Sequence, residues 1–183
     1  KTPAFTVSIS ISADEKYYFI NSSDHNTSEK YYFKVDEKVP MPKLIRKREK
    51  GIIYNVSSWA GYFYIHTNKD AEDFKIERSK NIISTNWETF IPPKNETMIG
   101  GLTFLNNWII RSELTNALDK IFVRDIKSNK EEELIFTDEN VYDPNISLTQ
   151  KDKDTDLIYI SYSTPKTQSS TYCKTSFFTH YAQ

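Results

Sequence analysis

Apolar and polar residues alternate in short stretches along the chain, and short polar breaks separate these stretches. Between Gly61 and Lys80, two alternating stretches flank a break rich in Asn and Asp at 68–73. Alternation with a period of two on both sides of such a break is typical of a β-hairpin. The polar loop is either an active-site loop or one blade tip among several, and further copies of the pattern decide between these hypotheses.

The alternating stretches recur in four series. The first series begins at Ala4, Ile52, Met98 and Val141, the second at Lys16, Gly61, Asn107 and Asp156, the third at Lys30, Phe74, Lys120 and Ser170, and the fourth at Pro42, Trp87 and Glu132. Each series repeats about every 45 residues, the length of a four-stranded propeller blade. The pattern therefore predicts an all-β partial propeller with three complete four-stranded antiparallel blades and an incomplete fourth.

The predicted blades cover residues 4–50, 51–97, 98–140 and 141–172, and we expect residues 173–183 to form a divergent, disordered tail. Because a sheet of short strands cannot shield both of its faces, the blades must stack. The apolar residues expected between the blades are Val7, Ile9, Phe19, Phe63, Ile65, Ile109, Ile110, Ile121, Val123, Ile158 and Ile160.

The loop at 68–73 has predicted counterparts at 21–28, 112–119 and 163–169, and this shared position favours a repeated structural turn over a unique catalytic loop. A propeller closes with roughly four to eight blades. We therefore expect this chain to be part of a larger ring. An open arc exposes two blade faces and an unpaired edge, so we also expect self-association.

Composition adds exclusions to this picture. The formal net charge of -1 gives no basic field for nucleic acid, and no apolar run approaches the roughly 20 residues that span a bilayer. We expect neither nucleic acid nor a membrane as partner. Cys173 is the only cysteine, which excludes an intramolecular disulfide and fits a reducing, cytoplasmic compartment.

Five Asn-x-Ser/Thr sequons would be glycosylation acceptors in a secreted protein. They begin at Asn21, Asn26, Asn55, Asn95 and Asn145. Because the sequence begins without a signal peptide, we interpret them as chance matches in a chain rich in Asn, Ser and Thr.

Catalytic candidates are few. None of the four glycines belongs to a G-x-S-x-G nucleophile elbow. A triad requires a His beside a nucleophile, and the candidates are His25 in a turn, His66 within a strand and His180 in the tail. We interpret the first two as structural or solvated and the third as disordered. Cys173 beside Lys174 could have a lowered thiol pKa, but a strand end favours an ordinary thiol.

Metal, phosphate and ring-stacking motifs each have a more ordinary interpretation. The acidic runs at 70–73 and 151–156 lack the glycine and distal glutamate of an EF-hand, so we expect solvated loops and no metal or cofactor. The basic run at 43–50 either contacts phosphates or forms a charged outer edge strand, and its alternation favours the edge. The three tryptophans, Trp59, Trp87 and Trp108, could form a stacking platform for a ligand or pack between the blades. Packing between blades is the commoner role of repeated aromatic residues.

The repeats resemble the N-terminal propeller of the prolyl oligopeptidase family, within it most closely the oligopeptidase B (protease II) group. The stretches that carry the resemblance are SADEKYYFINSSDHNTSE at 12–29, FYIHTNKDAEDFKI at 63–76, NWETFIP at 86–92, IFVRDI at 121–126 and ISYSTPKTQSSTY at 160–172. They follow the family's order. One departure is Asp73, where the family usually has Asn.

The resemblance implies a seven-bladed propeller, of which this chain would be the C-terminal half, joined in the family to an α/β-hydrolase domain. The tail after Tyr172 differs from the family's continuation into that domain. A truncated or split gene product is therefore expected. The resemblance also implies a parent serine peptidase that cleaves short peptides after Lys or Arg, with the propeller filtering access to a triad outside this chain.

Two hypotheses from different classes follow. The chain is either an inactive propeller portion of such a peptidase, with peptide substrates in the parent and a separate hydrolase-domain polypeptide as a possible partner, or an autonomous propeller or sandwich whose tip loops bind protein or glycan. No catalytic, cofactor or metal residue within the chain is assigned in either case.

Overall fold

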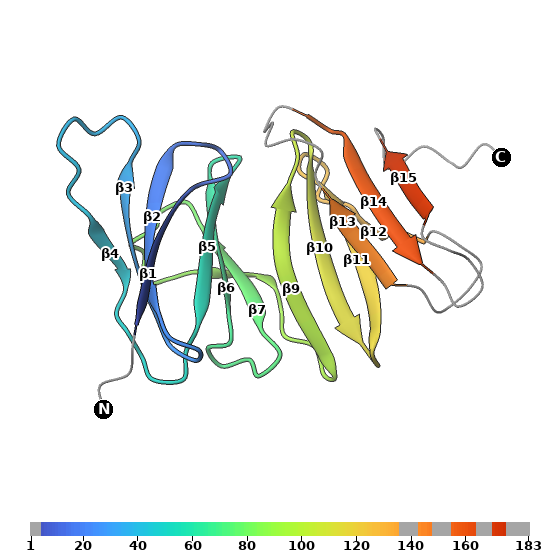
Figure 1. The fold of residues 1–183 in the computed structure, drawn as a ribbon, viewed down its shortest axis with the longest axis horizontal. Helices are drawn as coiled ribbons and strands as arrows, with labels where there is room; N and C mark the ends of the chain where they lie inside the picture. The colour runs from blue at the N-terminus through green and yellow to red at the C-terminus, as the bar shows by residue number, and fades with distance from the viewer. Residues whose placement is uncertain (1–4, 136–142, 148–154, 164–169, 175–183) are drawn as a thin grey trace. The chain divides into compact units, whose positions relative to one another are not determined.

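The computed structural model describes residues 5–135, 143–147, 155–163 and 170–174. Strands are the only regular elements in these segments, which confirms the all-β prediction. The chain divides into two compact units, Lys1–Asn95 and Glu96–Gln183. Figure 1 shows two sheets in each unit.

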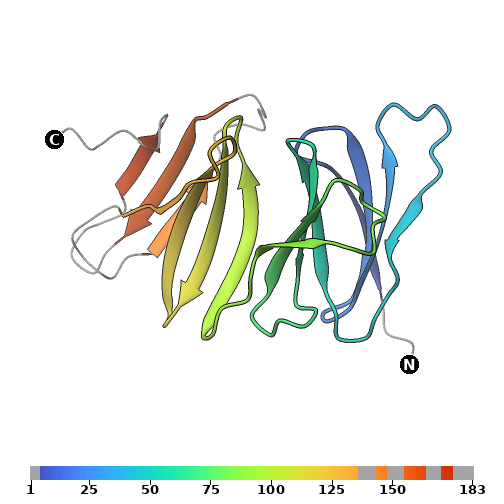
Figure 2. The ribbon, with the colours of Figure 1, turned by 180° about the vertical axis from the view of Figure 1, so that it is seen from behind.

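The first unit holds two four-stranded antiparallel sheets, in which every strand pairs with the next along the chain. The first sheet contains β1 (Thr6–Ile11), β2 (Tyr17–Ser23), β3 (Ser28–Lys34) and β4 (Lys43–Arg46), and the second contains β5 (Tyr54–Trp59), β6 (Tyr62–Thr67), β7 (Lys75–Ser79) and β8 (Glu88–Ile91). Figure 2 shows the same strand order from behind.

The second unit repeats this arrangement with one sheet of four strands and one of three. Its strands are β9 (Thr97–Phe104), β10 (Trp108–Thr115), β11 (Leu118–Asp125) and β12 (Glu131–Glu133) in one sheet, and β13 (Asp143–Ser147), β14 (Ile158–Ser163) and β15 (Ser170–Lys174) in the other. Four consecutive meander sheets, three with four strands and the last with three strands among the described residues, are those of the predicted partial β-propeller. Strand β15 includes Cys173 and Lys174, the first residues of the expected tail, and residues 175–183 lie outside the described segments.

In the first three sheets, the connections after the second strand have the same place in the strand order but different lengths. In the second sheet the loop spans 68–74, close to the prediction. In the third sheet the predicted loop 112–119 is wrong, because β10 continues to Thr115 and β11 begins at Leu118. Asn116 and Ala117 both have positive φ, 52° and 59°, as a two-residue type I′ hairpin requires. The loop predicted at 163–169 lies almost wholly outside the described residues.

Most of the predicted core is buried. In the first unit Phe19, Phe63 and Ile65 belong to one apolar cluster, and in the second unit Ile110, Ile121, Val123 and Ile160 belong to another. Ile109 is also buried, and the side chain of Ile158 lies outside the described part of the chain.

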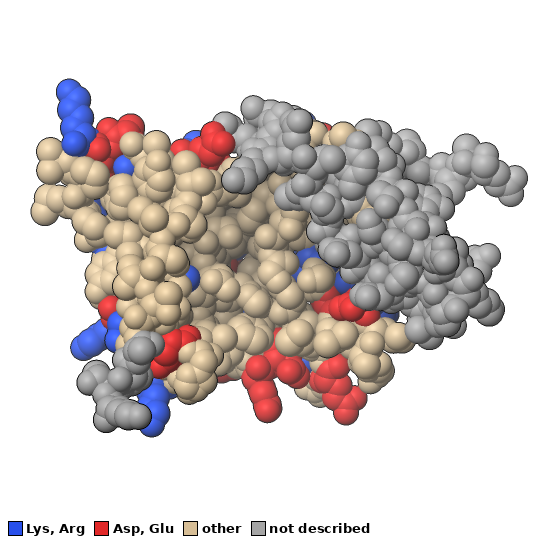
Figure 3. All heavy atoms as spheres, viewed as in Figure 1, with Lys and Arg blue, Asp and Glu red and all other residues tan. Residues whose placement is uncertain are grey.

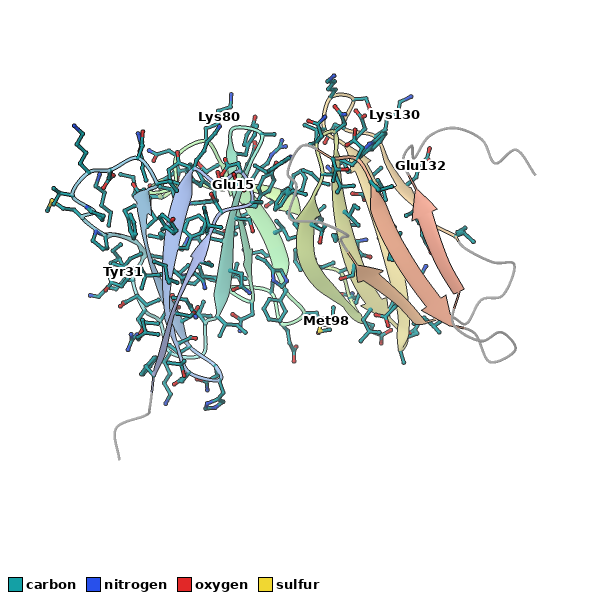
Figure 4. All side chains as sticks on the ribbon, turned by 45° about the horizontal axis from the view of Figure 1, so that its top comes forward. Glu15, Tyr31, Lys80, Met98, Lys130 and Glu132 are labelled. Carbon is teal, nitrogen blue, oxygen red and sulfur yellow. The ribbon has the colours of Figure 1, made fainter. Side chains whose placement is uncertain are left out.

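Val7 and Ile9 correct the predicted core, because they are 67% and 61% exposed. In register, Ile9 pairs with Ile20 whereas the buried Phe19 pairs with Ser10, and cross-strand partners share a face. Val7, Ile9 and Ile11 therefore lie on the face of the first sheet that is opposite to Phe19. That face, which we call the open face, also carries Tyr18, Ile20, Tyr31, Phe33 and Leu44. Tyr31 is labelled in Figure 4.

Several polar contacts of Tyr54 join the two sheets of the first unit. Its backbone N–H donates to Ser28 Oγ at 2.8 Å, and its hydroxyl accepts from the backbone N–H of Lys30 at 2.9 Å. The Tyr54 hydroxyl in turn donates to the carbonyl of Arg46 at 3.0 Å.

The part of the chain that the structure describes contains no helix that could span a membrane.

Candidate functional site

Of the candidate histidines, the structure describes His25 and His66, and the contacts seen around them do not form a catalytic triad. His25 is exposed, and the carboxylate of neighbouring Asp24 accepts from the backbone N–H groups of Asn26 and Thr27, at 3.0 and 2.8 Å, instead of orienting the imidazole. His66 stacks on Phe74 with ring centroids 4.6 Å apart. His180 and the side chain of Cys173 lie outside what the structure describes.

The acidic runs do not form a metal centre among the described residues. Asp70 and Glu72 are exposed, and Ala71 between them is buried. In the second run, Asp156 accepts two hydrogen bonds from Asn107, one from the backbone N–H at 2.8 Å and one from the side-chain amide at 2.6 Å. Asp156 therefore ties the turn before β14 to the turn before β10. Residues 151–154 are outside the described segments.

The polar start of the 68–74 loop fastens the connection between the first two sheets. Asn68 Oδ1 accepts from the backbone N–H of Ile53 at 2.9 Å, and its Nδ2 donates to the carbonyl of Gly51, also at 2.9 Å. Thr67 Oγ1 donates to the carbonyl of Ile53 at 3.0 Å. These contacts give this loop a structural role.

The first half of the basic run and two of the tryptophans have the expected positions. Lys43–Arg46 forms β4, the outer strand of the first sheet, but residues 47–50 follow it outside the strand, so the predicted edge strand is shorter than the run. Trp87 packs against the apolar cluster of the first unit, and Trp108 against that of the second. Both tryptophans therefore contribute to packing. In Figure 3, most of the visible face of the described residues is neither acidic nor basic, and the charged side chains lie mainly toward its margins.

A groove of about 760 Å³ lies within the first unit, lined by β4, β7 and the segments that follow each of them. Its volume falls in the range of about 300–1,000 Å³ typical of ligand sites. Ser28, Tyr54 and Thr67 also line it. The lining also includes the segment at 83–87, which we call the lip, and the residues Lys47, Glu49, Ile52, Lys69 and Asp70.

Glu77 is the charged centre of the groove. Its two oxygens accept from Arg46 at 2.9 Å and from Lys75 at 3.0 Å. Burial disfavours the charged carboxylate, but the hydrogen bonds from Arg46 and Lys75 outweigh it and lower the pKa of Glu77. The Arg46 guanidinium also lies over the Trp87 ring, 5.1 Å from its centroid. The groove thus holds two ordered cations around one carboxylate.

Lys30 is a buried charged residue that the sequence analysis did not predict. It is 7% exposed, and its Nζ donates to Asn21 Oδ1 at 2.7 Å. Burial lowers the pKa of Lys30 to about 8. The strand alternation contained the signal, because Ser28, Lys30 and Tyr32 share one face of β3, and Tyr32 pairs with the core residue Phe19. By the same alternation, Lys75 and Glu77 lie on one face of β7.

Comparison with known proteins agrees with the strand pattern. Residues 1–176 match the family described as "Prolyl oligopeptidase, N-terminal beta-propeller domain". The chain is 29% identical over 182 residues to Protease 2 of Moraxella lacunata, and the match covers 91% of this chain and 24% of that protein. The chain thus spans about a quarter of the length of this curated relative.

Two solved structures are similar over nearly the whole chain. Oligopeptidase B from Trypanosoma brucei, in a closed form with covalently bound antipain, has a TM-score of 0.84 at 25% identity, covering 96% of this chain and 26% of that protein. Oligopeptidase B from Leishmania major has a TM-score of 0.83 at 16% identity, covering 95% and 26% respectively. The second likeness concerns the fold alone.

Proposed function

The chain belongs to the prolyl oligopeptidase family through its N-terminal β-propeller domain, and from this premise we propose that it is the propeller portion of an oligopeptidase B-like serine peptidase. The observation that carries the proposal is the family match over residues 1–176, together with the identity to Protease 2. We propose that the parent peptidase cleaves short peptides after Lys or Arg in the cytoplasm. The single cysteine supports a reducing compartment.

In this proposal the propeller contributes access control and no catalytic group. The chain contains no G-x-S-x-G sequence, so the nucleophile, its acid and its histidine belong to a hydrolase domain. A ring of stacked sheets around a narrow channel admits an extended peptide and excludes a folded protein. The open face of the first sheet, with Val7 and Ile9 exposed, is expected to pack against a further sheet of the ring.

The hydrolase domain is either joined to this chain or supplied as a separate polypeptide. The test measures hydrolysis of short fluorogenic peptides with Arg, Lys or a neutral residue before the scissile bond. The assembly that contains both domains should prefer Arg and Lys by on the order of tenfold or more in kcat/KM. It should leave the same sequence uncut inside a folded protein.

The purified chain 1–183 is the matched control and should hydrolyse none of these peptides. Hydrolysis by this chain, lost on substituting one of its own residues, would show that it contains a catalytic site and would overturn the proposal. A complete assembly without Arg or Lys preference would contradict the assigned specificity.

A binding role is the second candidate, and the groove in the first unit favours it. The two roles are compatible, because a propeller can filter substrates and also hold part of a ligand at its surface.

A further inference from the structure

We propose that the groove of the first unit binds the carboxylate of a peptide, with Arg46 as the group that holds it. The choice of a peptide as the carrier rests on the proposed peptidase function. The anion site itself rests on the contacts of Arg46, on the charge of the groove and on the groups of the lip at 83–87.

Arg46 has donors to spare. A guanidinium carries five N–H groups, and among the described residues that of Arg46 makes one hydrogen bond, from Nη2 to Glu77 at 2.9 Å. Its position is fixed by this bond and by the Trp87 ring beneath it. A planar guanidinium held in this way can offer two parallel N–H groups to a carboxylate with little loss of side-chain entropy.

The charge of the groove suits a ligand with one negative charge. Its lining contains four cations, Arg46, Lys47, Lys69 and Lys75, and three carboxylates, Glu49, Asp70 and Glu77, an excess of one positive charge. Lys69 pairs with Glu49 at 2.6 Å, and Arg46 and Lys75 share Glu77. Lys47 makes no ion pair within the described part of the chain. One bound carboxylate would balance this excess charge, whereas a divalent phosphate would leave the groove with one net negative charge.

The lip at 83–87 offers groups for the rest of a peptide. Its internal hydrogen bonds include those from the Asn86 N–H to Ser84 Oγ at 3.0 Å and from the Trp87 indole N–H to the Ser84 carbonyl at 2.8 Å. Ile83 on the same lip is 57% exposed. An ordered polar edge beside an exposed apolar side chain suits an extended peptide that presents both backbone and side chain.

The test is calorimetric titration of the chain with a short apolar peptide that has a free C-terminal carboxylate, with the same peptide as its amide, and with inorganic phosphate. The acid peptide should bind about tenfold more tightly than the amide, because a charge-assisted pair is lost with the carboxylate. It should also bind more tightly than phosphate. Equal binding of acid and amide, or tighter binding of phosphate, would overturn the assignment.

Arg46→Gln should reduce affinity for the acid peptide by about tenfold and leave the weak binding of the amide unchanged. Arg78→Gln is the matched control, because Arg78 also pairs with a glutamate, Glu88, and lies over an aromatic ring, that of Tyr62, but does not line the groove. Equal losses in the two variants would contradict the proposal.

Circular dichroism and urea unfolding test whether Arg46→Gln is folded. Lys47→Gln gives an independent measurement if it is not, because Lys47 is exposed and unpaired among the described residues. It should weaken acid-peptide binding by about threefold, and unchanged binding would count against the site. Peptide binding and hydrolysis by the complete assembly are separate readouts, so failure of one proposal is distinguishable from failure of the other.

Discussion

Ser58 donates a hydrogen bond to Asp14 across one full repeat of the chain, from Oγ to Oδ2 at 2.8 Å, although the two residues are 44 positions apart. The other oxygen of Asp14 accepts from Ser12 Oγ at 2.7 Å. A carboxylate in the β1–β2 turn thus fastens the first sheet to the second. Asp156 and Asn107 make the equivalent connection between the two sheets of the second unit.

Replacing Asp14 by alanine is expected to destabilise the first unit by about 1–3 kcal/mol, because it leaves the Ser12 and Ser58 hydroxyls without their acceptor. Urea unfolding measures the change. Asp36→Ala is the control, since Asp36 is exposed and makes no hydrogen bond within the described residues. A loss as large in Asp36→Ala would show that the effect does not come from the contact between sheets.

Lys30 should make stability depend on pH above neutrality. Burial lowers its pKa from 10.5 to about 8 in the folded protein. Below pH 8 the lysine is charged in both states, and the folded state bears the full cost of the buried charge, about 3 kcal/mol at most. Stability should therefore rise as the pH increases from 8 toward 10.5, because the folded protein releases its proton first.

Lys30→Met should raise the free energy of unfolding at pH 7 and remove this rise, whereas the exposed Lys34→Met should do neither. Measurements between pH 7 and 10 avoid Tyr54, whose pKa burial raises to about 12. Tyr54 favours the folded state below pH 10, and its contribution is lost as the pH rises through 12. A flat stability profile in the wild-type chain would contradict the prediction for Lys30.

Gly100 and Gly101 are neighbours in β9 with opposite tolerance for a side chain. A Cβ at Gly100 would overlap Ser112 Oγ and lie 2.8 Å from the Ser112 carbonyl oxygen, whereas a Cβ at Gly101 would meet nothing within 4 Å. The β9–β10 register shifts at this point, between Arg111 and Glu113. Gly100→Ala should cost about 1–3 kcal/mol and Gly101→Ala less than about 0.5 kcal/mol in urea unfolding. Similar values for both would contradict the local geometry.

Arg111 should be highly sensitive to substitution, because it is buried and pairs with two glutamates. Arg111 and Glu113 are each 3% exposed and 2.8 Å apart, and Arg111 also pairs with Glu131 at 2.7 Å. Arg111→Met leaves Glu113 buried without this cation and should destabilise by about 3–5 kcal/mol in chemical unfolding. Lys120 and Glu133 form an ion pair whose side chains are 37% and 30% exposed, respectively. Lys120→Met breaks this pair and should lower the free energy of unfolding by about 1 kcal/mol or less. Equal costs would refute the distinction.

The strands could be predicted from the sequence, because each sheet forms from consecutive segments in which apolar and polar residues alternate. Phe19, Phe63 and Ile65 were correctly placed in the core by alternation alone. Alternation assigns residues to a face, but it cannot say whether that face is covered, and for this reason Val7 and Ile9 were misplaced.

The groove was harder to predict, because it depends on side chains from different sheets. Arg46 and Glu77 are 31 residues apart, and nothing local marks them as partners. The two-residue turn at Asn116 was missed for a different reason: the neighbouring loops are longer, and the repeat suggested equal lengths. Positive φ at Asn116 and Ala117 depends on turn chemistry, which varies between blades.

The open face should make the isolated chain self-associate. Val7, Ile9 and Ile11 are 67%, 61% and 48% exposed on one strand at the free edge of its sheet, and an apolar face beside an unpaired edge favours association. Replacing Val7 and Ile9 by threonine keeps β-propensity while removing apolar area, and should shift the chain toward monomer in sedimentation velocity. The control replaces Val39 and Met41 by threonine, because these residues are 78% and 69% exposed but lie in the β3–β4 connection, outside the sheet. If the control variant becomes monomeric to the same extent, or if the unmodified chain is already a monomer at micromolar concentration, the open face does not cause association.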